Sequence, residues 1–142
     1  MIFGKRERLI GRILVVEDEP LVAFDNEHML SDAGYEVVAT VDNVADAATV
    51  IEEQELDLVL TDIRLAGDGD GTEVARLAGS RKVPVLFVSA NCPPEASALG
   101  VGCLAKPYTS RDLRQALEAV DELLQGNEVK KLPPGLSLFE KA

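Results

Sequence analysis

Three carboxylates and one lysine each come directly after a short apolar run. They are Glu17 and Asp18 after residues 13–16, Asp62 after residues 58–61, and Lys106 after residues 101–105. Short runs rich in Val, Leu and Ile are typical of buried parallel strands, which are apolar on both faces. Ligand sites in open α/β sheets lie just outside the carboxyl ends of the strands. We therefore expect these side chains to meet at one edge of a sheet, although a lone Asp at a strand end is more commonly a turn residue.

Such a group of side chains could bind a metal ion and accept a phosphoryl group. Three carboxylates close together repel one another, so they favour a hard divalent cation. Mg²⁺ prefers oxygen ligands, here predicted to be Glu17, Asp18, Asp62 and the backbone carbonyl of Arg64. Asp62 is the candidate nucleophile, because carboxylates attack phosphorus to form acyl phosphates. Two further side chains complete the predicted site: Lys106 as a point charge for a phosphoryl oxygen and Ser89 as a hydrogen-bond donor.

The rest of the chain alternates predicted strands with predicted helices. The predicted strands cover residues 13–16, 35–41, 57–61, 83–88 and 101–105, and the predicted helices cover 20–33, 43–53, 71–78, part of 90–100, and 110–125. Asn43 is a good N-cap for the second helix, and Thr109 or Ser110 for the last. Alternation of this kind predicts a five-stranded parallel sheet with helices on both faces, a doubly wound α/β fold.

The segment between the fourth and fifth strands is unusually short. It has eleven residues, 90–100, and includes Pro93 and Pro94. This leaves room for about two helical turns, so we expect a short or irregular fourth helix. In the first helix, Leu21 and Phe24 lie beside the apolar stripe, where they are either flank packing or an exposed docking patch.

Composition limits the classes of function. A chain of 142 residues fits one domain, and its net charge of −11 argues against direct binding to nucleic acid. No apolar run is long enough for a membrane span, and residues 1–12 are too short and too charged for a secretory signal. We expect Cys92 and Cys103 to be free cytosolic thiols rather than a disulfide. The expected divisions are an N-terminal extension (1–11), a domain (12–126) and a C-terminal tail (127–142) that docks back or onto a partner.

Four segments resemble the receiver domain of two-component response regulators, a CheY-like, flavodoxin-like (βα)5 fold. They are residues 13–20, 60–62, 88–90 and 106–108, and the resemblance covers about residues 12–125. It implies that Asp62 accepts a phosphoryl group, with Mg²⁺, from a sensor histidine kinase or a histidine phosphotransfer protein. It also implies a cytoplasmic bacterial phosphoprotein that acts as a regulatory phosphoacceptor and not as an enzyme, apart from self-catalysed phosphotransfer and slow autodephosphorylation. A cis Lys106–Pro107 bond is implied as well.

The resemblance further predicts how the chain signals. No output domain is expected after residue 126, so the chain resembles stand-alone regulators that dock to a partner or pass on or drain phosphate, as a monomer or weak dimer. The predicted switch residues are Ser89, Cys103 and Tyr108. Three features depart from the family pattern. Cys103 stands where receivers often have Tyr or Phe, the segment 90–100 is too short for the usual fourth helix, and the glycine-rich loop after Asp62 lacks the usual proline.

Other readings of the same residues are weaker. A pseudo-receiver that binds partners without phosphate is the main alternative, and the intact set of acids, serine and lysine argues against it. A small aspartyl phosphatase would resemble this pattern but has a second Asp two residues after the nucleophile, where this chain has Arg64. Dinucleotide binding is disfavoured because no G-x-G-x-x-G follows the first strand.

Overall fold

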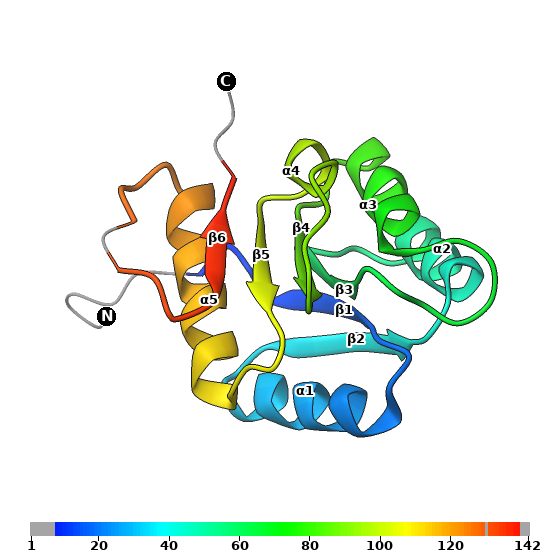
Figure 1. Ribbon diagram of the computed structural model, residues 1–142, viewed down its shortest axis with the longest axis horizontal. Coiled ribbons are helices and arrows are strands. Elements are labelled where there is room, and N and C mark those ends of the chain that lie inside the picture. Colours follow the sequence, from blue (N-terminus) through cyan, green and yellow to red (C-terminus); the bar gives the residue numbers. More distant parts are fainter. Residues whose placement is uncertain (1–7, 130, 140–142) are drawn as a thin grey trace.

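The computed structural model describes residues 8–129 and 131–139. Within these residues the chain forms six strands and five helices, which alternate up to the last helix (Figure 1). In chain order they are β1 (Arg12–Val16), α1 (Pro20–Asp32), β2 (Glu36–Val41), α2 (Val44–Glu53), β3 (Leu58–Asp62), α3 (Gly71–Ser80), β4 (Val85–Ser89), α4 (Ala96–Leu99), β5 (Gly102–Ala105), α5 (Ser110–Leu124) and β6 (Leu136–Leu138).

The strands form one sheet in the order β2-β1-β3-β4-β5-β6. The first five strands in this order are parallel, which confirms the predicted doubly wound sheet. The predicted number of five strands misses β6, which pairs antiparallel with β5 through Cys103 and Ser137. This strand comes from the segment predicted to be a tail, and its described residues dock back onto the domain. By covering the free edge of β5, β6 satisfies backbone groups that would otherwise be open to pairing with another chain.

Helices cover both faces of the sheet and create two hydrophobic cores (Figure 1). On one face, α1 and α5 pack on the inward side chains of the strands, with Leu30, Leu113 and Leu117 fully or almost fully buried. On the other face, α2, α3 and α4 pack around Phe87 and its neighbours. The strands are therefore apolar on both sides, as buried parallel strands must be.

Local signals in the sequence set where the helices begin. Pro20 occupies the first turn of α1, where its missing N–H leaves no hydrogen bond unmade. The side chain of Asn43 accepts a hydrogen bond from the N–H of Asp46 and caps α2, as predicted. Thr109 caps α5 and forms a capping box with Asp112. These caps fix the loops that lead into each helix at the carboxyl edge of the sheet.

The segment between β4 and β5 is as short as predicted. The helix α4 has four residues, Ala96–Leu99, and only Ala96 is buried among them. No helix formed by the described residues is both long and apolar enough to cross a bilayer.

The prediction of two free thiols is wrong, because Cys92 and Cys103 form a disulfide. Strand β5 pairs with β4, so Cys103 lies beside Phe87 in the sheet. The chain leaving β4 then turns back over this position, and the Cα atoms of the two cysteines are 6.6 Å apart. The eleven-residue spacing alone does not reveal this approach, which depends on a very short α4.

Candidate functional site

The three predicted carboxylates lie together at the carboxyl edge of the sheet. Strands β1 and β3 are parallel neighbours with Val16 opposite Thr61, so the residues that follow, Glu17 and Asp62, lie side by side. One oxygen each from Glu17, Asp18 and Asp62 lies within 4.8 Å of the others. The sequence prediction of an acid cluster at this edge is therefore confirmed.

Lys106 joins this cluster from the end of β5. Its Nζ donates hydrogen bonds to Asp62 Oδ2 at 2.7 Å and to Glu17 Oε1 at 2.9 Å. A third hydrogen bond, to Glu19 Oε1, is 3.1 Å long. Burial disfavours the charged ammonium, but the hydrogen bonds to Asp62 and Glu17 outweigh this and raise the pKa of Lys106. The lysine therefore remains a cation that neutralises part of the negative charge.

Glu17 is the most deeply buried of the acids, with 3% of its surface exposed. Its Oε2 accepts a hydrogen bond from the N–H of Glu19, and its own N–H donates to the carbonyl of Val41 on β2. Burial raises the pKa of Glu17 to about 7, despite the hydrogen bond from Lys106. A buried carboxyl of this kind gains much from a cation that replaces its lost hydration.

The backbone around Asp62 is held by the loop that returns to α3. Oδ1 of Asp62 accepts a 3.3 Å hydrogen bond from the N–H of Arg64, and the N–H of Gly71 donates to the carbonyl of Ile63 at 2.7 Å. A Cβ on Gly71 would overlap the carbonyl oxygen of Asp62. The contact between α3 and the end of β3 therefore requires a residue without a side chain, and it fixes the position of Asp62.

Ser89 lies at the end of β4 and faces the next loop. Its Oγ donates to the carbonyl of Asn91 at 2.9 Å and accepts from the N–H of Asn91 at 3.2 Å. The Ser89 carbonyl accepts a 2.9 Å hydrogen bond from the N–H of Lys106, so the serine is adjacent to the lysine through the backbone. In this state the hydroxyl is bonded to the loop after β4.

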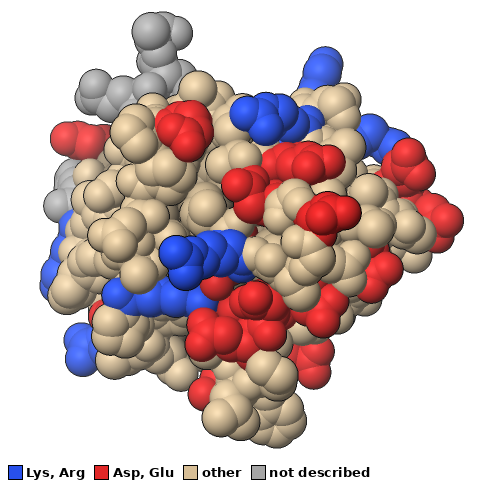
Figure 2. Space-filling model, turned by 45° about the vertical axis from the view of Figure 1, so that its right-hand side comes forward, with Lys and Arg blue, Asp and Glu red and all other residues tan. Residues whose placement is uncertain are grey.

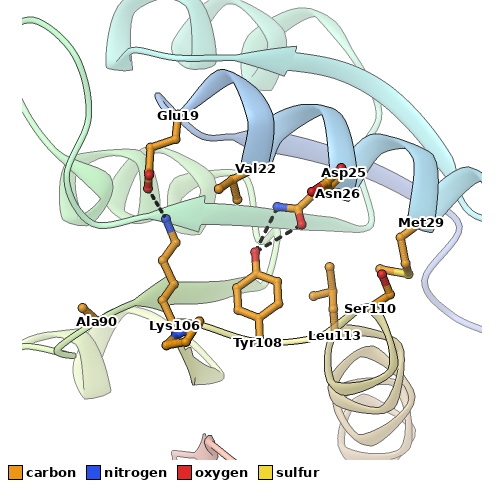
Figure 3. A pocket seen from close by; sticks show the side chains of 11 residues that line it. Glu19, Val22, Asp25, Asn26, Met29, Ala90, Lys106, Tyr108, Ser110 and Leu113 are labelled. Carbon is orange, nitrogen blue, oxygen red and sulfur yellow. Dashed lines mark hydrogen bonds and ion pairs between the residues drawn. The ribbon is translucent and has the colours of Figure 1, made fainter.

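Tyr108, the third predicted switch residue, faces α1. Its Oη accepts a 3.0 Å hydrogen bond from Asn26 Nδ2 and donates to Asn26 Oδ1 at 3.2 Å (Figure 3). Burial raises the pKa of Tyr108 to about 12. The preceding Lys106–Pro107 bond is cis, as the resemblance implies.

The donor set fits Mg²⁺. Three carboxylates from two strand ends supply hard oxygen ligands, and Asp18 is more exposed than Glu17 and Asp62. A cavity of about 330 Å³ opens beside them and is lined by Glu17, Asp18, Asp42 and Asp46 among others. Space for water beside few protein ligands is what Mg²⁺ requires, because the ion keeps several waters.

A second cavity of about 460 Å³ lies next to the cluster, between α1 and the loop from β5 to α5. Figure 3 shows Lys106 extending toward Glu19 along one side of this cavity, with Val22 and Leu113 among its apolar lining residues. Outside it, Leu21 and Phe24 on α1 are 80% and 59% exposed. Both are therefore surface residues and not flank packing. Figure 2 shows that acidic side chains crowd one face of the molecule, with a few basic side chains beside them.

Comparisons with known proteins agree with this arrangement. The family model of the response regulator receiver domain matches residues 13–118. The chain belongs to this family. Similar receiver domains include that of the sensor histidine kinase PA1611 from Pseudomonas aeruginosa, whose structure has a magnesium ion coordinated in the active site cleft. It is 31% identical, the match covers 76% of this chain and 94% of that chain, and the TM-score is 0.66.

Other receiver relatives are similar at the same level. A response regulator receiver protein from Sinorhizobium medicae is 33% identical, with a TM-score of 0.70 and coverage of 84% of this chain and 98% of that one. The transcriptional regulatory protein PdtaR of Mycobacterium tuberculosis is 30% identical over 75% of this chain and 55% of its own length. The positive alginate biosynthesis regulatory protein of P. aeruginosa is 35% identical over 75% and 45%. The chain thus spans about half the length of the curated relatives it matches.

Sequence reasoning missed two contacts of this receiver site. Glu19 forms an ion pair with Lys106, as two of the predicted acids do. Its position in the acidic run 17–19, directly before α1, could have indicated this contact. Asn26 holds Tyr108, but nothing in the sequence distinguishes a buried Asn on α1 from a solvated one. The predicted role of the Arg64 carbonyl stays a prediction, because the contact that the structure gives for this residue is made by its N–H.

Proposed function

We propose that this receiver domain accepts a phosphoryl group on Asp62, with Mg²⁺ bound by Glu17, Asp18, Asp62 and the Arg64 carbonyl. The observation that carries the proposal is the contact of Lys106 Nζ with Asp62 Oδ2, beside two further carboxylates. A carboxylate beside a fixed cation, in a cluster suited to a divalent metal, matches the requirements of phosphoryl transfer. The transferring group carries negative charge that must be neutralised.

Each side chain then has one role. A carboxylate oxygen of Asp62 attacks phosphorus and forms the new P–O bond, while the P–N bond to the donor imidazole breaks and the imidazole keeps the electron pair and takes up a proton. Lys106 holds one phosphoryl oxygen as a point charge. Bound Mg²⁺ supplies further positive charge toward the phosphoryl oxygens. The reaction is a transfer to the protein itself, so the chain acts as a regulatory phosphoacceptor.

Signalling follows from a redistribution of hydrogen bonds. Phosphorylation replaces one negative charge on Asp62 by about −1.5 to −2 and adds acceptor oxygens. These oxygens compete with Asn91 for the hydroxyl of Ser89, which lies at the end of the neighbouring strand. When Ser89 turns, the loop that begins at Ala90 loses two hydrogen bonds and changes its surface. Two charge-assisted hydrogen bonds, each worth about 1.5–3 kcal/mol, suffice for a large population shift.

The phosphodonor is a sensor histidine kinase or a histidine phosphotransfer protein, in the cytoplasm where such donors act. It docks on α1, because Leu21 and Phe24 are exposed on the helix that directly follows the acid run and that also contributes Val22 to the cavity beside Lys106. Output by docking or by passing on phosphate, without nucleic acid or membrane contact, remains the predicted mode. We also propose that the receiver domain covers residues 12–126, a range that includes the matched residues 13–118.

The test is labelling with acetyl phosphate and Mg²⁺, followed by mass spectrometry of the intact protein. The parent protein is expected to gain one phosphoryl group, and Asp62→Asn none. The matched control is Asp57→Asn, at a carboxylate that accepts hydrogen bonds from Gly11 and Arg12 at the opposite end of β3; it should label like the parent. A parent protein that gains no label with Mg²⁺ present would instead favour the phosphate-independent pseudo-receiver.

The docking face has its own test. A Leu21→Ala/Phe24→Ala variant should label normally from acetyl phosphate but about tenfold more slowly from a phosphorylated histidine phosphotransfer protein that labels the parent. Leu132→Ala is the matched control, since Leu132 is an exposed apolar side chain in the segment before β6. Equal rates from the protein donor for all three forms would show that the donor docks elsewhere.

A further inference from the structure

The Cys92–Cys103 disulfide joins the loop after β4 to the centre of β5, at the place where the proposed switch must move. Ser89 ends β4 and Cys92 follows three residues later, with Asn91 bonded to the Ser89 hydroxyl. Cys103 is held in β5 between Phe87 of β4 and Ser137 of β6. A covalent bond thus fixes residue 92 of the loop, three residues after the Ser89 hydroxyl at the end of β4.

The two sulfurs differ sharply in their surroundings. Cys103 is 1% exposed and belongs to the core around Phe87 and Ala96, whereas Cys92 lies in an exposed loop. Cys92 is therefore the residue on the solvent side of the bond, and an external thiolate has to approach from that side. Access is one of the factors that control thiol–disulfide exchange. A disulfide with one of its two residues at the surface can be approached by a reductant without unfolding of the core.

The surroundings of the bond allow it to open without loss of the fold. The loop of residues 90–95 has exposed residues at most positions, and α4 contributes only Ala96 to the core. Cys103 is paired with Phe87 of β4 and Ser137 of β6 through the backbone, and this pairing does not involve the sulfur. Opening the bond therefore frees the loop, and the sheet stays intact.

We propose that Cys92–Cys103 is a reversible redox site that controls how freely the loop after β4, and with it Ser89, responds to phosphorylation. The reductant is a dithiol, of the kind found in thioredoxin-like proteins. Its first thiolate attacks Cys92 Sγ, a mixed disulfide forms, and Cys103 leaves as a thiolate that takes up a proton. The second thiol of the reductant then attacks the mixed disulfide, which releases Cys92 as a thiol and leaves the reductant as a disulfide. Two electrons and two protons pass to the protein.

The direction of control follows from the geometry. In the disulfide state the bond holds residue 92 over β5, which keeps Asn91 within reach of Ser89 and favours the hydroxyl bonded to the loop. In the dithiol state that restraint is gone, and the Ser89 hydroxyl turns more readily toward a phosphoryl group on Asp62. This coupling rests on the proposed function, whereas the tether itself does not.

The tether is tested first, by hydrogen exchange of the Asp62→Asn protein, which carries no phosphoryl group. Amides of residues 90–100 are expected to exchange at least tenfold faster after treatment with dithiothreitol than in the oxidised protein. In Cys92→Ser, a change at an exposed position, these amides should exchange as fast as in the reduced protein, with or without dithiothreitol. Cys103→Ala, which removes the other sulfur, should give the same result. Two free thiols after mild oxidation with diamide, or equal exchange in both states, would overturn the proposal.

The coupling is tested with the parent protein, Mg²⁺ and beryllium fluoride, which resembles a phosphoryl group on Asp62. We expect amide shifts over residues 83–108 that are at least twofold larger in the reduced protein and in Cys92→Ser than in the oxidised protein. Equal shifts in both redox states, with acetyl phosphate still labelling Asp62, would overturn the redox control alone. Failure to label Asp62 in either state, with the exchange difference intact, would overturn the phosphorylation function and its coupling while leaving the tether established.

Discussion

The acid cluster and the β4–β5 region lie at the same edge of the sheet but are built differently. The cluster draws Glu17, Asp62 and Lys106 from three strand ends, held by parallel pairing that continues into the core. The β4–β5 region depends on one helical turn, a disulfide and an antiparallel edge strand. The cluster is thus fixed by the centre of the sheet, and the loop by connections that are local and, at the disulfide, reversible.

This difference separates a rigid part from an adjustable one. A site that must hold a metal and a phosphoryl group gains from ligands fixed on strand ends, because misplacement lowers the benefit of each interaction. A segment that must change its surface gains from few buried contacts.

Gly71→Ala tests the rigid part. The new Cβ overlaps the carbonyl oxygen of Asp62, which is backbone and cannot turn away as a side chain could, so we expect a loss of about 3 kcal/mol in the free energy of unfolding. Gly79→Ala in the same helix is the control, because nothing lies within 4 Å of its new Cβ and alanine favours the helix by about 0.5–1 kcal/mol. Urea unfolding followed by circular dichroism measures both. A Gly71→Ala protein as stable as the parent would show that the end of β3 is as adjustable as the loop after β4.

Leu136→Ala tests the edge of the sheet beyond β5. Leu136 is 7% exposed and packs in the core beneath α5, so its truncation should cost about 2 kcal/mol, the lower end of the range for buried leucines. Leu132→Ala, at an exposed leucine four residues earlier, should change stability by less than about 0.5 kcal/mol. If both variants unfold at the same urea concentration as the parent, the packing of β6 does not contribute to the stability of the domain.

The same contrast explains how much could be predicted from the sequence. The acid cluster was predictable because each of its members directly follows an apolar run, and parallel strands bring their carboxyl ends together whatever the loops do. The Cys92–Cys103 bond could not be predicted, because it depends on the conformation of a loop that its length alone does not determine. Strand β6 was missed because it has only three residues, too few to show the alternation of a strand. Its pairing with β5 also depends on contacts that are distant in the sequence.

Lys106→Met tests whether the lysine competes with a metal ion for the carboxylates of the cluster. The ammonium contacts two of the three predicted carboxylate ligands, so its removal leaves their negative charge uncompensated. We expect Mg²⁺ to bind about tenfold more tightly, which corresponds to about 1.4 kcal/mol, while beryllium fluoride no longer shifts the amides of residues 83–108. Isothermal titration calorimetry measures the affinity, and Lys131→Met, a lysine outside the cluster, should leave it unchanged. Unchanged or weaker binding in Lys106→Met would show that the lysine does not compete with the cation for these oxygens.

The smallest effect concerns Tyr108, which connects the loop after β5 to α1 through Asn26 and not to the β4–β5 region. Burial raises the pKa of its phenol from 10.0 to about 12, and burial also raises the pKa of Tyr35, the other tyrosine of the chain. Between pH 10 and 12 the unfolded chain therefore releases protons that the folded chain retains, so stability should be unaffected at neutral pH and should fall as the pH rises through this window. Ultraviolet absorbance of the phenolate should show both tyrosines ionising above the ordinary value, and Tyr108→Phe should remove the transition near pH 12. An ordinary pKa for Tyr108 in the folded protein would mean that this side chain swings free of α1, and it would then belong with the adjustable loop and not with the rigid cluster.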